Sequence, residues 1–152
     1  MSEEHAFKFV RPIKVIFRDL DGMRHVNHAV YLSYCEAARN EYWMHVTGIS
    51  RVEQYDFVLA ELTARYRFPA SLGDELLVAC GVTELHRSSF VMQHEIRQAQ
   101  GGKLVADLSI VGVMYDYAAD KTMRLSEQRR HQIEAFEGRG LSMADAEATR
   151  AD

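Results

Sequence analysis

One stretch of this chain decides its fold: residues 17–39, FRDLDGMRHVNHAVYLSYCEAAR. Two carboxylates, two imidazoles and one amide fall within ten of these residues, from Asp19 to His28. A β-branched run precedes the stretch and helically spaced aromatics follow within it, so it should join a strand to a helix. A helix start leaves backbone N–H groups unpaired, and these can hold a developing negative charge. A carboxylate beside such donors is the minimum arrangement for attack on an acyl group.

Composition excludes several classes of protein. The chain has 152 residues, 47% of them hydrophobic, which predicts a single domain over residues 1–152. A formal net charge of −4 argues against nucleic-acid binding. Two cysteines without CxxC spacing favour neither a disulfide framework nor a structural zinc site. No apolar run would span a bilayer and the acidic first residues lack signal-peptide features, so we expect a cytoplasmic protein without a membrane partner.

Residue periodicity outlines the remaining elements. A strand is expected at 13–17 and a helix from Asn27, its cap, to a stop at Gly48. A period of two, which begins at Asp56, then predicts four strands. The first shows its alternation over 62–68 and is ended by Pro69, and the others lie at 75–85, 90–98 and 103–117. Ser126 should cap a short helix to about 136, which leaves 138–152 as a polar tail. Consecutive hairpins form an antiparallel sheet, which can bury the single long helix only by curling around it.

This order of elements resembles that of the hotdog-fold thioesterases, in particular the branch of 4-hydroxybenzoyl-CoA and acyl-CoA thioesterases. The resemblance covers about residues 10–136 and rests on three motifs: the stretch from Asp19 to Arg39, YRFPA at 66–70 followed by Gly73-Asp74, and Ser88-Ser89-Phe90. It implies an α+β hotdog fold, with a five-stranded antiparallel sheet wrapped around one long central helix and a short C-terminal helix. It also implies an acyl-CoA thioesterase that needs no cofactor, and a homodimer or homotetramer with sites built from two chains.

The resemblance assigns roles to residues of the first motif. Asp21 would be the catalytic carboxylate, as nucleophile or general base, and the backbone N–H of His28 would bind the thioester carbonyl. His25 would orient the loop or assist proton transfer. The chain departs from its relatives at Met23, where acyl-carrier-protein thioesterases have Asn, and at Arg24, where many hotdog thioesterases have Gly.

Other polar residues have weaker signals. The candidate substrate-binding residues are Asn27, Tyr31, Arg87, Ser88 and Ser89, although a helix cap, a core aromatic and a plain turn would explain them equally well. Arg65 and Arg67 are further candidate phosphate partners. Asp19 should be structural, bonded to the loop backbone or paired with Arg24 or Arg39. The two histidines lack a third ligand, so no metal is expected.

Three alternatives remain open at this point. The chain could be an acyl-carrier-protein thioesterase, another hotdog enzyme such as a hydratase, or a non-catalytic acyl-CoA-binding protein. A hydratase would need a His–Asp or His–Glu pair on one helix, which the sequence does not present. Retention of Asp21 favours an enzyme. Cys35 is a poor nucleophile because it falls in the apolar stripe of the helix without a base nearby.

Overall fold

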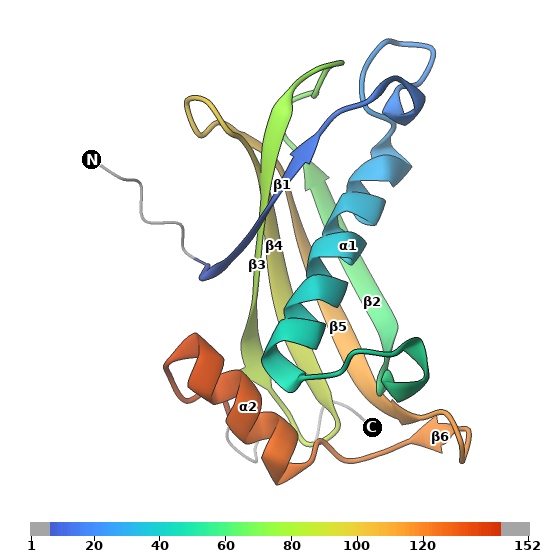
Figure 1. Ribbon diagram of the computed structural model, residues 1–152, viewed down its shortest axis with the longest axis vertical. Coiled ribbons are helices and arrows are strands. Elements are labelled where there is room, and N and C mark those ends of the chain that lie inside the picture. Colours follow the sequence, from blue (N-terminus) through green and yellow to red (C-terminus); the bar gives the residue numbers. More distant parts are fainter. Residues whose placement is uncertain (1–6, 144–152) are drawn as a thin grey trace. The chain divides into compact units, whose positions relative to one another are not determined.

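A computed structural model describes residues 7–143 of the chain (Figure 1). Two compact units make up this region: residues 7–42, 63–81 and 93–108 form the first, and residues 43–62, 82–92 and 109–143 form the second. The elements follow in the order β1 (Phe9–Lys14), η1 (Phe17–Asp19), α1 (His28–Thr47), η2 (Val52–Gln54), β2 (Phe57–Tyr66), β3 (Glu75–Leu85), β4 (Ser89–Gln98), β5 (Leu104–Asp116), β6 (Lys121–Thr122) and α2 (Glu127–Glu137).

The strands form one sheet in the order β1-β3-β4-β5-β2, with the two-residue β6 paired to β5. β1 runs antiparallel to β3, in a register that pairs Phe9 with Cys80 and Lys14 with Glu75. One long helix, α1, and one short C-terminal helix, α2, accompany the five main strands. The predicted α+β hotdog fold is therefore confirmed. Neither described helix is long and apolar enough to cross a membrane.

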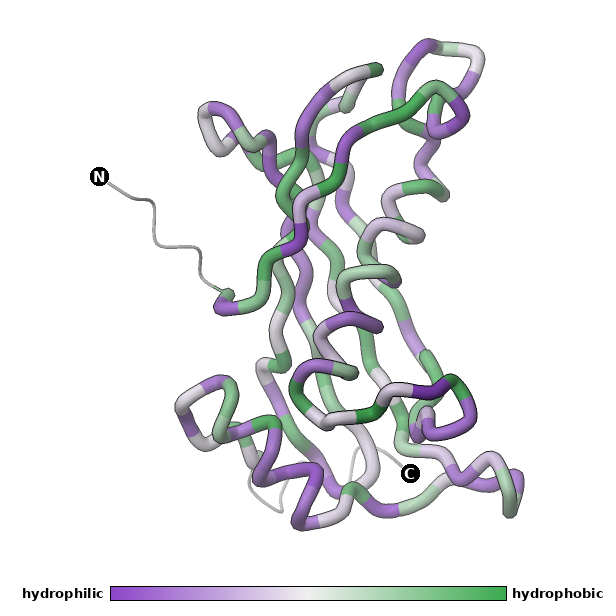
Figure 2. Tube along the Cα trace, viewed as in Figure 1, coloured by the Kyte–Doolittle hydropathy of each residue, from purple (hydrophilic) through white to green (hydrophobic). Residues whose placement is uncertain are grey.

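In the first unit, α1 packs on the sheet through the stripe that its spacing predicts. Tyr31, Tyr34, Cys35, Ala38 and Tyr42 are all at most 7% exposed. Buried residues alternate along β4 and most of β5, whereas β3 has a continuous buried run at 78–82, and Figure 2 shows the accompanying changes of hydropathy along the strands. Burial of these side chains provides the main favourable free energy of folding for this unit.

In the second unit, Trp43 is the centre of an aromatic cluster. Its ring stacks on Phe90 at a centroid distance of 5.0 Å and lies 4.7 Å from Phe57. Gly112 on β5 makes room for this cluster, since a Cβ there would come within 2.2 Å of Cζ of Phe90. The predicted cap of α2 is present, because Ser126 Oγ accepts the Arg129 N–H at 3.1 Å.

Two predicted strand boundaries are wrong. The first strand lies at 9–14 instead of 13–17, because Asp19 accepts the Ile16 N–H and turns the chain into η1. Pro12 is tolerated within β1 because this strand lies at the sheet edge and pairs only with β3. β2 starts at Phe57, in agreement with the change of period at Asp56, but ends at Tyr66, two residues before the predicted end at Phe68.

The predicted polar tail at 138–152 is only partly visible. Residues 144–152 lie outside the described region. Within the visible part, the Leu85 N–H donates to the Leu141 carbonyl at 2.9 Å, and the Leu141 side chain is buried. The start of the tail is therefore attached to the second unit, and the single-domain organisation stays a prediction.

A buried polar pair interrupts the core of the first unit. His94 on β4 is 1% exposed and Arg39 on α1 is 5% exposed. Neither ring nitrogen of His94, nor Nη1 of Arg39, has a hydrogen-bond partner in the described region. Burial, followed by the positive charge of Arg39, lowers the pKa of His94 from 6.5 to about 3. The imidazole is therefore neutral at physiological pH, because protonation would add a second positive charge to the core beside Arg39.

The buried imidazole should make stability depend on pH. Unfolded His94 takes up a proton as the pH falls below 6.5, whereas the folded residue does so only near 3. Above pH 6.5, His94 therefore does not lower the free energy of unfolding. On acidification the free energy of unfolding falls by about 1.4 kcal/mol per pH unit, which amounts to about 2 kcal/mol by pH 5. Urea unfolding at pH 7.5, 6.0 and 5.0 should show a shallower pH slope for His94→Leu than for the unaltered chain.

The matched control for this experiment is His131→Leu, which removes an exposed imidazole from α2. This variant should keep the slope of the unaltered chain. If the free energy of unfolding changed equally with pH in the unaltered chain and in His94→Leu, His94 would not be the cause of the acid-induced loss of stability.

Candidate active site

The loop between η1 and α1 folds back on itself around Asp21. Leu20 and Val26 form an antiparallel bridge, and the Asp21 N–H donates to the His25 carbonyl at 3.0 Å. Asp21 Oδ1 accepts the Met23 N–H at 2.8 Å, which is the local turn that an Asp favours. The second carboxylate oxygen of Asp21 has no hydrogen-bond partner within residues 7–143. A turn role thus uses one oxygen of Asp21 and leaves the other available.

Asp19 has the structural role that its position predicts. Its Oδ2 accepts the Tyr34 hydroxyl at 2.6 Å and the Ile16 N–H at 3.1 Å. The Asp19 carbonyl also accepts the Asn27 N–H at 2.9 Å. Of the expected partners, the loop backbone is therefore the correct one, while the pairing with Arg24 or Arg39 is not found. Burial and the Asp19 carboxylate raise the pKa of Tyr34, so its hydroxyl remains a donor.

The start of α1 presents an open backbone donor. Asn27 caps the helix as expected, because its Oδ1 accepts the Ala29 N–H at 2.9 Å and its carbonyl accepts the Val30 N–H at 2.9 Å. The His28 N–H has no partner in the described part of the chain. At a helix N-terminus, where the dipole is positive, such a donor favours an anionic or polarised oxygen.

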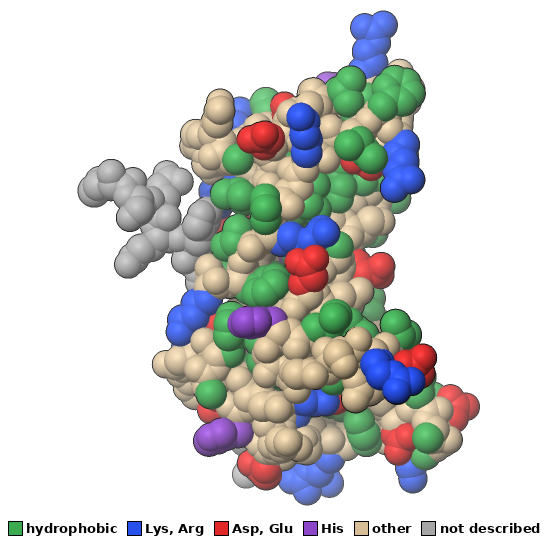
Figure 3. Space-filling view, viewed as in Figure 1, with side chains coloured by type: hydrophobic (Ala, Val, Ile, Leu, Met, Phe, Trp, Pro, Cys, Tyr) green, Lys and Arg blue, Asp and Glu red, His purple; other side chains and the backbone are tan. Residues whose placement is uncertain are grey.

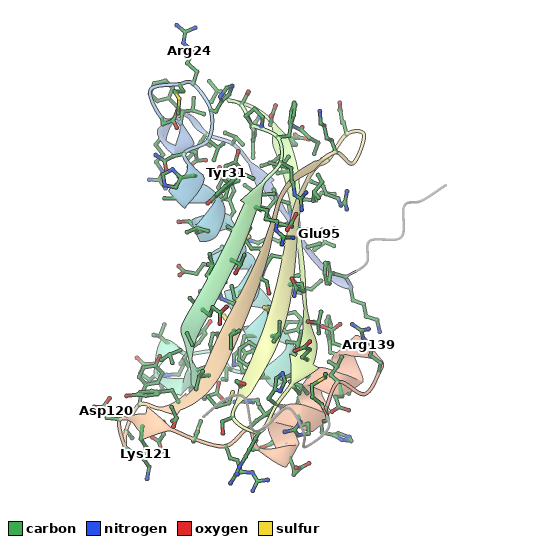
Figure 4. All side chains as sticks on the ribbon, turned by 180° about the vertical axis from the view of Figure 1, so that it is seen from behind. Arg24, Tyr31, Glu95, Asp120, Lys121 and Arg139 are labelled. Carbon is green, nitrogen blue, oxygen red and sulfur yellow. The ribbon has the colours of Figure 1, made fainter. Side chains whose placement is uncertain are left out.

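Asp21 and His28 line the same pocket, a cavity of about 300 Å³ within the first unit. Its walls come from the loop, the first turn of α1 and the end of β2 with the residues after it: Asp21, Met23, His25, Val26, His28, Tyr31, Tyr66, Arg67, Phe68 and Pro69. Figure 4 shows Tyr31 between α1 and the end of β2. The pocket thus brings together four of the predicted site residues, Asp21, His25, His28 and Tyr31.

The mouth of the pocket is partly apolar. Met23 lines the pocket and is 76% exposed, and Phe68, also in the lining, is 38% exposed. Figure 3 shows hydrophobic side chains at the surface at this end of the first unit, beside Lys and Arg side chains. An entrance of this kind suits a ligand that has both an apolar part and an anionic part.

The remaining predicted site residues lie elsewhere. Arg87, Ser88 and Ser89 belong to the second unit and do not line this pocket. Their carbonyls accept backbone N–H groups of Leu125, Met114 and His86, respectively, so all three have a structural role in the β3–β4 connection. Whether their side chains bind a substrate stays a prediction. Arg67 does line the pocket, where its Nε donates to Asp107 at 2.9 Å.

Sequence reasoning missed Tyr66 as a member of the site. The Tyr66 hydroxyl donates to the His28 carbonyl at 3.0 Å, and the Ala70 N–H donates to the Tyr31 hydroxyl at 3.0 Å. The motif YRFPA contained the signal, because its first and last residues make these two contacts. No metal centre accompanies the pocket: among the described residues, no three His, Cys, Asp or Glu side chains are grouped to hold an ion.

Comparison with known families assigns the chain. Residues 15–133 match the model of the thioesterase-like superfamily. The chain belongs to the thioesterase-like superfamily. This thioesterase is 31% identical over 130 residues to the long-chain acyl-CoA thioesterase FadM of Escherichia coli, covering 80% of this chain and 94% of FadM. It is 34% identical over 91 residues to the acyl-CoA thioesterase YbgC of Helicobacter pylori, covering 60% and 68% of the two chains.

Solved structures agree with this family. A thioesterase from Thermus thermophilus, crystallised with coenzyme A and zinc, superposes with a TM-score of 0.80 and 36% identity, covering 89% of this chain and 98% of that one. A 1,4-dihydroxy-2-naphthoyl-CoA thioesterase from Synechocystis has a TM-score of 0.72 and 26% identity, covering 82% and 94%. The predicted family and the predicted enzyme class, a thioester hydrolase, are confirmed.

Arg24 carries backbone strain in the loop of this thioesterase. Its φ is +67°, in the left-handed region, and its side chain points away from the molecule (Figure 4). Glycine, which the resemblance to hotdog thioesterases leads us to expect here, adopts that conformation without strain. Left-handed backbone costs other residues roughly 1–2 kcal/mol.

Arg24→Gly should therefore stabilise the protein by about 0.5–1 kcal/mol, because the greater freedom of glycine in the unfolded chain offsets part of the relief. Urea unfolding measures this change. Arg24→Ala is the matched control: it removes the guanidinium but keeps a Cβ, so it should not stabilise the protein. Equal effects of the two substitutions would show that the side chain and not the backbone is responsible.

Proposed function

We propose that this chain hydrolyses acyl-CoA thioesters to a free carboxylic acid and CoA. One observation carries the proposal: Asp21 and His28 line the same pocket. Within residues 7–143, one carboxylate oxygen of Asp21 and the backbone N–H of His28 have no hydrogen-bond partner. The acyl-CoA thioesterase relatives support the choice of substrate.

In the proposed mechanism, the thioester carbonyl oxygen accepts the His28 N–H at the positive end of α1. This contact stabilises the negative charge that develops on the oxygen as the carbonyl carbon becomes tetrahedral. Asp21 either attacks that carbon, giving a mixed anhydride that water then hydrolyses, or takes a proton from the attacking water. In both versions the C–S bond breaks and CoA leaves as a thiolate that gains a proton. A thiolate is a good leaving group, so His25 need not act as a general acid.

The pocket supports an acyl group more than a highly charged ligand. Val26, Tyr31, Phe68 and Pro69 provide apolar walls, and a volume of about 300 Å³ lies at the small end of ligand sites. The acyl group and the end of the pantetheine arm would occupy it. Arg67 at the wall, and Arg87 with Ser88 and Ser89, remain candidate partners for the CoA phosphates and pantetheine.

We expect thiol release from a panel of aliphatic and aromatic acyl-CoAs, followed with a thiol reagent. Asp21→Asn should lower kcat about a hundredfold or more, because the amide keeps the turn acceptor but cannot act as nucleophile or base. Asp116→Asn is the matched control, since Asp116 Oδ1 accepts the Ala118 N–H in a similar turn outside the pocket. It should retain full activity.

Two outcomes would contradict the proposal in different ways. Absence of thiol release from every acyl-CoA would refute the enzyme activity, and binding of acyl-CoA without release would favour the non-catalytic alternative. Full activity of Asp21→Asn would refute the role of this residue. Thioesters of the same acyl groups with acyl carrier protein test whether the chain is an acyl-carrier-protein thioesterase. In that case the acid would be released faster from the carrier protein than from CoA.

We further propose that the chain acts in the cytoplasm as a homodimer or homotetramer. β2 is an edge strand of ten residues, and Leu59 on it is 43% exposed. Long uncovered edges favour pairing with another chain. Sedimentation velocity should show a dimer or larger species, and Leu59→Lys, a charge placed on the edge, should shift it toward the monomer. A monomer at all concentrations would refute the assembly.

A further inference from the structure

The backbone N–H of His28, at the start of α1, needs a fixed orientation to act as an oxyanion donor. Asn27 accepts the N–H groups of Ala29 and Val30, which leaves the His28 N–H as the donor without a partner in the described region. His28 is exposed and is the first residue of the helix. Helix ends fray, and a terminal residue without outside contacts samples several backbone conformations. A fixed direction for this N–H therefore requires a contact from another element.

Tyr66 makes that contact from the end of β2. Its hydroxyl donates to the His28 carbonyl at 3.0 Å, across 38 positions of sequence. The Tyr66 ring lies edge-on to the His28 imidazole at a centroid distance of 6.4 Å, and it lies 5.5 Å from the ring of Tyr31. Tyr31 is itself fixed by the Ala70 N–H. The first turn of α1 is therefore held by two aromatic residues whose hydroxyls bond to the backbone.

The hydroxyl of Tyr66 has no role in packing. Tyr66 is 48% exposed, and a phenylalanine ring would occupy the same place against His28 and Tyr31. The only hydrogen bond of this hydroxyl in the described region is the one to the His28 carbonyl. Burial raises the pKa of Tyr66, so the hydroxyl keeps its proton at neutral pH and remains a donor.

We propose that Tyr66 is a positioning residue of the thioesterase reaction: its hydroxyl holds the His28 carbonyl and thereby fixes the direction of the His28 N–H. This inference rests on the proposed function. The carbonyl and the N–H flank one Cα, so only the φ and ψ torsions of His28 separate them. An oxyanion donor works only when it is aimed at the developing charge. Loss of the hydroxyl should therefore weaken transition-state stabilisation more than substrate binding.

The test is Tyr66→Phe, assayed for thiol release from the best acyl-CoA of the panel. We expect kcat to fall about tenfold, with KM within about twofold of the unaltered value, because the donor is loosened and not removed. The matched control is Tyr117→Phe in the second unit, which removes the same kind of bond, from the Tyr117 hydroxyl to the Phe57 carbonyl at 2.9 Å. This variant should leave kcat unchanged.

A binding measurement separates positioning from a general loss of structure. A CoA analogue with a trifluoromethyl ketone in place of the thioester adds water, or the Asp21 carboxylate, at its carbonyl carbon, and the former carbonyl oxygen of this tetrahedral adduct takes the place of the oxyanion. Tyr66→Phe should weaken the binding of this analogue by about the same factor as kcat, while the affinity for CoA itself is unchanged. A purely structural role would lower the melting temperature without this difference between the two ligands.

The outcomes are distinguishable from those of the proposed function. A normal kcat for Tyr66→Phe in an active enzyme overturns this inference alone, and so does an equal loss of affinity for CoA and for the ketone analogue. A chain that releases no thiol from any acyl-CoA refutes the proposed function and this inference together.

Discussion

The start of α1 has to satisfy its backbone donors, and the rest of the site depends on how it does so. Asn27 accepts two N–H groups of the first turn and leaves that of His28 open within the described region. The two backbone N–H groups that precede His28 bond to residues outside the helix: Val26 donates to the Ala70 carbonyl and Asn27 donates to the Asp19 carbonyl. Three segments of the first unit therefore meet at one helix end. Because each buried backbone group needs a partner, none of the three can shift without breaking such a bond.

Three tyrosines reinforce this junction in the same physical way. Tyr34 donates to Asp19, Tyr66 donates to His28, and Tyr31 accepts from Ala70. A tyrosine combines a large apolar ring with one polar atom, so it can bury area and still satisfy a backbone or carboxylate group. The contact from Tyr34 also occupies Asp19. Of the two carboxylates in the loop, Asp21 is the one that lines the pocket, whereas Asp19 is bonded through Oδ2 to Tyr34 and to the backbone of Ile16.

The first unit also contains features that destabilise the folded state. Arg24 occupies left-handed backbone in the loop, and the core contains an imidazole and a guanidinium nitrogen without hydrogen-bond partners in the described region. Such features cost free energy, and apolar burial elsewhere in the unit has to offset it. His94 and Arg39 do not line the pocket. Acidification should thus affect stability through a part of the unit that is separate from the catalytic groups.

The sequence by itself determined the features that depend on near neighbours. The cap at Asn27, the buried stripe from Tyr31 to Tyr42 and the turn at Asp21 involve residues within a few positions of one another, so periodicity and residue type were sufficient. Only the tertiary structure decided the end of β1, the partner of Asp19 and the contact of Tyr66 with His28. The contacts of Asp19 and Tyr66 join residues 15 and 38 positions apart, and no local pattern of residues encodes them. The end of β1 depends on whether the Ile16 N–H donates to Asp19 or to a neighbouring strand, which the sequence pattern does not show.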